Sequence, residues 1–137
     1  MFHRVLVPVD FTDKNDDAIE MAARLVDDDG LVTLIHVVQA VPGIDVEEER
    51  DFYARLESAA EQELAALGDR LKGKGVAWRA VLVVGSRAGE ILAVAEDGVD
   101  LVVVSSHRVD LRHPVAGAGT LSYQIAIAAP CPVLLVK

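Results

Sequence analysis

Residues 5–38 read VLVPVDFTDKNDDAIEMAARLVDDDGLVTLIHVV, and this stretch decides the fold. Its two ends, 5–9 and 32–38, are almost continuously apolar and rich in β-branched residues, which is typical of strands buried on both faces. The segment between them, 13–26, has helical periodicity. A helix that joins two buried strands favours parallel pairing through a right-handed crossover. The stretch therefore predicts one strand-helix-strand unit of an open parallel sheet.

The remainder of the chain repeats this alternation of strand and helix. Further apolar runs typical of buried strands occur at 76–84, 101–104 and 133–136. Segments with helical periodicity occur at 46–71, 88–96 and 121–129. Strands that alternate with helices form parallel sheets covered by helices on both faces. We therefore predict an α/β fold, a doubly wound five-stranded parallel sheet that forms a single domain over residues 1–137.

Glycines follow three of the predicted helices. A glycine in the left-handed backbone conformation commonly ends a helix, because it lacks the Cβ atom that makes this conformation unfavourable. The pattern predicts helix ends at Gly30, at Gly73 and Gly75, and at Gly98.

Composition and charge narrow the classes of partner and the location. The chain has 22 acidic and 13 basic residues, and its formal net charge of −9 repels nucleic-acid phosphates. Cys131 is the only cysteine, so neither an internal disulfide nor a thiolate metal site is expected, which suits a reducing compartment. The chain shows no secretion signal, and no apolar run approaches the roughly 20 residues that span a bilayer. We expect a cytoplasmic protein that binds neither nucleic acid nor membrane.

Two loops after predicted strands are the candidate ligand site, since ligands of open parallel sheets bind beyond the carboxyl ends of the strands. The first loop contains Asp10, which either binds an amino or hydroxyl group of a ligand or caps the following helix. The second loop, 105–119, is long for a connection without secondary structure, and such loops are usually functional or disordered. It ends at Gly119 and Thr120, where backbone amides and a hydroxyl either bind an anion or simply cap the last helix.

Four segments resemble the universal stress proteins, and together they extend over nearly the whole chain. They are VLVPVDFT at 5–12, LIHVV at 34–38, DLVVVSSH at 100–107 and GTLSYQIAIAAPCPVLLVK at 119–137. The last is the most specific, because in this family a Gly-Ser or Gly-Thr pair opens the helix that precedes an APCPVLVV-like strand. The resemblance implies the strand order 3-2-1-4-5, with the change of winding direction between the first and fourth strands.

Many universal stress proteins bind ATP, and the resemblance implies which residues would do so here. Asp10 and Val37 match the family's aspartate and apolar neighbour of the adenosine group. The family's phosphate motif is G-x2-G-x9-G-[ST], and Gly119 with Thr120 matches its end. Ser105 and Arg108 stand where the first two glycines belong, and ten residues instead of nine separate Arg108 from Gly119. With these losses, the sequence resembles the branch of the family that does not bind ATP.

Arginines of the same loop offer two interpretations of the altered motif. Arg108 and Arg112 could bind phosphate through their guanidinium groups in place of the lost backbone amides. Alternatively, Arg108 could pair with Asp110 and fill the site.

The last strand is a candidate dimer interface. As an apolar strand at the edge of the sheet, it is able to pair with a second chain. The resemblance implies a homodimer formed through this strand, whereas nearby prolines could instead protect the edge of a monomer. The interface residues are Val133, Leu134, Leu135 and Val136.

These observations favour a dimeric stress-response or regulatory module that acts by binding and is not an enzyme. One alternative is a stress protein that binds ATP or AMP and has weak ATPase activity. Another is a dimeric scaffold whose 105–119 loop recognises a protein partner that the sequence does not identify. The four histidines lack the spacing typical of metal ligands, so no metal site is predicted.

Overall fold

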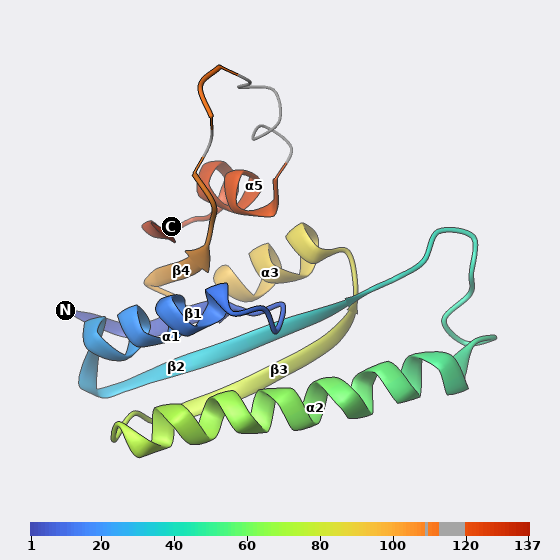
Figure 1. Cartoon of the computed structure of the whole chain (residues 1–137), viewed down its shortest axis with the longest axis horizontal. Coiled ribbons are helices and arrows are strands. Elements are labelled where there is room, and N and C mark those ends of the chain that lie inside the picture. The colour runs from blue at the N-terminus through green and yellow to red at the C-terminus, as the bar shows by residue number, and fades with distance from the viewer. Residues whose placement is uncertain (109, 113–119) are drawn as a thin grey trace.

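A computed structural model describes residues 1–108, 110–112 and 120–137 (Figure 1). It contains one five-stranded, all-parallel sheet in the order β3-β2-β1-β4-β5. The strands are β1 (Phe2–Pro8), β2 (Val26–Gln39), β3 (Trp78–Gly85), β4 (Leu101–Ser105) and β5 (Val133–Val136). The helices of the described residues are α1 (Lys14–Leu25), α2 (Arg50–Gly73), α3 (Arg87–Ala95) and α5 (Leu121–Ala128). The predicted doubly wound fold and its strand order are confirmed.

Helices cover both faces of the sheet, with α1 and α2 on one face and α3 and α5 on the other (Figure 1). Alternate residues of β1 separate the two layers, since Val5 and Val7 pack beneath α1 and α2 while Leu6 packs beneath α3 and α5. This two-sided burial explains why the strands are almost continuously apolar. Among the described residues, no helix is both long enough and apolar enough to cross a membrane.

The expected helix end at Gly30 is wrong, whereas those at Gly75 and Gly98 have the expected left-handed backbone. β2 follows α1 directly at Val26, so Gly30 lies inside the strand. A Cβ atom there would come within 2.7 Å of the His3 carbonyl oxygen. Gly30 is therefore required for the close approach of two strands. In the sequence, a glycine in this role cannot be distinguished from one that ends a helix.

Gly68 lets α2 pack closely against the indole ring of Trp78, so replacing it is expected to destabilise the fold. A Cβ atom at this position would lie 2.2 Å from the ring. Alanine normally stabilises a helix interior by about 1 kcal/mol relative to glycine. Because the half-buried ring must move, Gly68→Ala should instead lower the free energy of unfolding by about 1–3 kcal/mol in urea denaturation.

Gly73 provides the matched control for this substitution. It lies in the same helix, and a Cβ atom there would meet nothing within 4 Å. Gly73→Ala should be neutral or stabilising by up to about 1 kcal/mol. Equal stability of the two variants would contradict the close packing of Gly68 on Trp78.

Candidate functional site

A cavity of about 570 Å³ lies at the carboxyl ends of the strands, where β1 and β4 diverge. This volume is within the range of small-molecule sites. Helices α1, α3 and α5 begin at its wall, so their positive ends face the cavity. Its lining includes Asp10, Asn15, Val37, Arg87, Ser105 and Thr120.

Asp10 lies in the turn between β1 and α1 and is held there by Thr12. One carboxylate oxygen accepts hydrogen bonds from the Thr12 amide at 3.0 Å and the Thr12 hydroxyl at 2.7 Å. Burial alone would raise the pKa of Asp10, but the hydrogen bonds from Thr12 and Asn15 outweigh it and lower the pKa below its usual value. The charged carboxylate has about four lone-pair positions, so acceptors remain for a ligand. Because α1 begins at Lys14, Asp10 shapes the turn and does not cap the helix.

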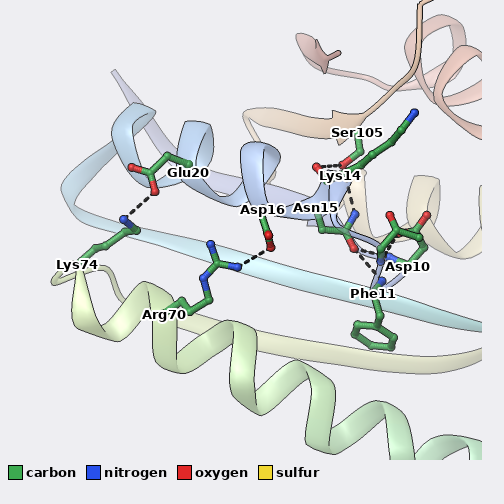
Figure 2. A network of polar contacts seen from close by, with 10 residues as sticks. Asp10, Phe11, Lys14, Asn15, Asp16, Glu20, Arg70, Lys74 and Ser105 are labelled. Carbon is green, nitrogen blue, oxygen red and sulfur yellow. Dashed lines mark hydrogen bonds and ion pairs between the residues drawn. The ribbon is translucent and has the colours of Figure 1, made fainter.

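Asn15, which the sequence analysis did not single out, connects this turn to β4 (Figure 2). Only 2% of the residue is exposed. Its Oδ1 accepts hydrogen bonds from the amides of Asp10 at 3.0 Å and Phe11 at 2.8 Å, and its Nδ2 donates to the Ser105 hydroxyl at 3.2 Å. These bonds hold Phe11 at φ 65°, a left-handed conformation that is uncommon for a residue other than glycine. One buried amide thus positions both loops of the site.

Ser105 lines the cavity, but its hydroxyl is already used in the structure. The hydroxyl donates to the Lys14 carbonyl oxygen at 3.1 Å and accepts from Asn15 (Figure 2). The residue that replaces the first glycine of the phosphate motif therefore ties β4 to the start of α1.

The described contacts of the second loop's arginines differ from those that the sequence suggested. Arg108 is exposed and is not among the described residues that line the cavity. Arg112, and not Arg108, pairs with Asp110, through two contacts of 3.1 Å between its guanidinium and the two carboxylate oxygens. Hydrogen bonds from Arg112 lower the pKa of Asp110. Gly119, the other predicted residue of this loop, lies outside the described residues.

The wall formed by β2 is apolar and aromatic. Val37 lines the cavity and is only 6% exposed. Next to it, His36 Nδ1 lies 2.8 Å from the Val9 carbonyl oxygen. Since a carbonyl only accepts, Nδ1 carries the proton in this contact. The Phe11 ring stacks on His36 with a centroid distance of 4.3 Å, which holds the imidazole of this lining residue in place.

Hydroxyl groups gather where α5 begins. Thr120 caps the helix, because its Oγ1 accepts a hydrogen bond from the Tyr123 amide at 3.3 Å. Ser122 Oγ lies 3.3 Å from that oxygen and 3.2 Å from Ser106 Oγ. Capping is thus shown for Thr120, and three neighbouring hydroxyls together with the positive end of α5 form a polar end of the cavity.

Two features outside the cavity are poor candidates for a functional site. Ligand atoms of His3, Asp27 and Asp29 lie within 4.8 Å of one another, a grouping across two strands that residue spacing does not reveal. The His3 and Asp29 side chains are 55% and 85% exposed, which gives the group the character of a solvated surface. Burial, together with the charge of Asp100, raises the pKa of the Cys131 thiol and disfavours a reactive thiolate.

The fold and the cavity define the class of this protein as a doubly wound α/β protein with a ligand-sized site at its crossover point. The chain belongs to the universal stress protein family, whose family model matches residues 1–137. A comparison with curated protein sequences found no match.

Several solved structures are similar over the whole fold. The hypothetical protein MJ0577, solved in a structure-based assignment of biochemical function, is 28% identical with a TM-score of 0.81, covering 100% of this chain and 96% of that one. A universal stress protein solved in complex with cAMP is 19% identical with a TM-score of 0.72, covering 99% and 97%. An Arabidopsis thaliana universal stress protein family protein with AMP bound is 22% identical with a TM-score of 0.70, covering 98% and 91%.

Proposed function

We propose that this chain is a cytoplasmic, dimeric regulatory module that binds an adenine nucleotide in the cavity between β1 and β4. The observation that carries the proposal is that Asp10, Val37 and Thr120, which are far apart in sequence, line one cavity of about 570 Å³. The altered glycine motif had favoured a site without nucleotide. The size of the cavity, which is that of a small-molecule site, nevertheless supports binding. The side chain of Ser105, which stands in place of the first glycine, is held at the wall by its bonds to Lys14 and Asn15.

The chemistry of the cavity walls suits the parts of a nucleotide. The apolar surface at Val37 matches an adenine ring, whose burial removes a large flat surface from water. The Asp10 carboxylate is an acceptor for ribose hydroxyls. The hydroxyls around Thr120 and the positive end of α5 suit phosphate oxygens. The similar proteins solved with cAMP and with AMP bound support the same class of ligand.

Mass spectrometry of the small molecules released from purified protein tests the proposal without assuming a ligand. We expect an adenine nucleotide near one equivalent per chain, and equilibration with AMP before desalting should raise a low occupancy. A protein that releases no adenine compound after either treatment would contradict the proposal.

The proposed dimer pairs β5 of two chains. β5 is at the edge of the sheet and pairs with β4 alone among the described strands. Its four residues are only half-buried in the single chain. The Val102 amide donates to the Pro132 carbonyl, and the Ser106 amide donates to that of Val136. Because alternate residues of an edge strand direct their backbone groups outward, Val133 and Leu135 present theirs to a partner.

Removal of one outward amide should therefore separate the dimer. Leu135→Pro deletes the amide in the middle of β5 while leaving the bonds to β4, and proline is tolerated on an edge strand at such a position. Sedimentation at micromolar concentration should give twice the chain mass of 14.7 kDa for the natural protein and for Leu135→Val, but the chain mass for Leu135→Pro. Circular dichroism verifies that the variant is folded. A natural protein that sediments as a monomer would contradict the dimer.

A further inference from the structure

We infer that Lys14 binds the phosphate of the nucleotide and replaces, with a side-chain cation, the donors lost with the glycines of the phosphate motif. The inference rests on the proposed function, since it assigns the residue that recognises the anionic part of the same ligand. Lys14 lines the cavity and is the first residue of α1. Neither the composition nor the glycine motif of the sequence points to it.

The position of Lys14 is fixed from its backbone. The Ser105 hydroxyl donates to the Lys14 carbonyl oxygen at 3.1 Å, so the residue is held at the end of β4, where the altered motif begins. Figure 2 shows the Lys14 side chain extending from α1 past Ser105. In this way the side chain that replaced a glycine also holds the backbone of the residue that carries the cation.

The charge of Lys14 has no ion-pair partner among the residues that the structure describes. A cation at the first residue of a helix faces the positive end of the helix dipole, which is unfavourable. Lys14 forms no ion pair with any other residue that the structure describes, whereas Asp16 and Glu20 of the same helix pair with Arg70 of α2 and with Lys74, which follows α2 (Figure 2). An anion in the cavity would supply the missing partner.

Among the described residues, several other donors near this end of the cavity are already engaged or carry no charge. The Ser105 hydroxyl is engaged by Lys14 and Asn15. The guanidinium of Arg112 is engaged by Asp110, and Arg108 is not among the described lining residues. The hydroxyls of Ser106, Thr120 and Ser122 are neutral, so beside the partial charge of the α5 end they add no positive charge. An ammonium group, with three donors on a flexible stem, supplies that charge.

Arg87 is the other basic residue with a permanent charge in the described lining, and it lies at a different wall. It follows β3, whose last residue Gly85 pairs with Gln39 at the end of β2. This places Arg87 near the strand that carries Val37, the side proposed for the base. Arg87 is thus a matched control for Lys14, since both are exposed cations that begin helices at the same cavity.

Calorimetric titration with adenosine, AMP and ATP tests the assignment, because only the phosphate distinguishes these ligands. For Lys14→Met we expect affinity for AMP to fall about tenfold and affinity for ATP to fall at least as much. Affinity for adenosine should stay within about twofold of the natural protein. Arg87→Met should leave the ratio of adenosine to AMP dissociation constants unchanged.

Two outcomes separate this inference from the proposed function. If the natural protein binds AMP and Lys14→Met keeps the same adenosine-to-AMP ratio, the inference is wrong and the proposed function stands. If none of the three ligands binds, the proposed function is wrong, and nuclear magnetic resonance with inorganic pyrophosphate then decides whether Lys14 serves an anion site. Shifts of the first-turn amides of α1 and α5 that disappear in Lys14→Met would support an anion site. Equal shifts in both proteins, or none in the natural protein, would overturn it.

Discussion

Asp10→Ala should raise the dissociation constant for AMP and ATP at least about 100-fold, which corresponds to the loss of two hydrogen bonds to a charged group. Asp10 lines the cavity, and although burial alone would raise its pKa, hydrogen bonds lower the pKa overall and favour the charged carboxylate. Alanine removes the carboxylate that the amide and hydroxyl of Thr12 hold at the cavity wall. Isothermal titration calorimetry measures the change directly.

Substitution of Thr12 is the control for this experiment, since Asp10 also shapes its own turn. Thr12→Val deletes the hydroxyl that donates to Asp10 at 2.7 Å but leaves the Thr12 amide bond and the carboxylate in place. We expect its affinity for AMP to stay within about fivefold of the natural protein. Equal losses in the two variants would mean that the shape of the turn, and not the carboxylate, determines binding.

Asn15→Ala should lower the free energy of unfolding by about 2–4 kcal/mol. The Asn15 side chain is almost completely buried and makes hydrogen bonds to two backbone amides and to the Ser105 hydroxyl. Alanine would leave the amides of Asp10 and Phe11 without an acceptor and would release the left-handed conformation of Phe11. Urea denaturation followed by circular dichroism measures the loss.

Asp17→Ala is the matched control, because Asp17 is an exposed residue in the same first turn of α1. Its only expected contribution is a favourable interaction with the helix dipole, about 0.5 kcal/mol. A loss below about 0.5 kcal/mol in Asn15→Ala would show that the bonds from Asn15 do not hold the two loops together.

The fold was predictable from the sequence because burial of strands on both faces leaves a strong signal. The apolar runs at 5–9 and 101–104 fall within or next to the strands β1 and β4 of the structure. The strand order followed from the resemblance to the family. Details that depend on contacts between distant residues were missed, as Gly30 shows, because a glycine required by the neighbouring His3 carbonyl looks like a glycine that ends a helix.

The candidate site was predictable in part from the places where the strands end. The ends of parallel strands meet at one edge, so Asp10 could be expected at this site, and the resemblance to the family implied Val37 there. Asn15 and Lys14 could not, since an amide and a cation in the first turn of a helix look like ordinary surface residues. Ser105 was expected at the site, but its hydrogen bonds to Lys14 and Asn15 give it a supporting role that sequence spacing does not reveal.

Calorimetric titration of the purified chain with AMP and ATP tests the nucleotide proposal most directly. Binding in the cavity predicts saturation at one nucleotide per chain with a dissociation constant below about 1 mM, and loss of that binding in Asp10→Ala. Absence of saturable binding of either nucleotide up to several millimolar, by folded protein freed of any ligand from purification, would contradict it.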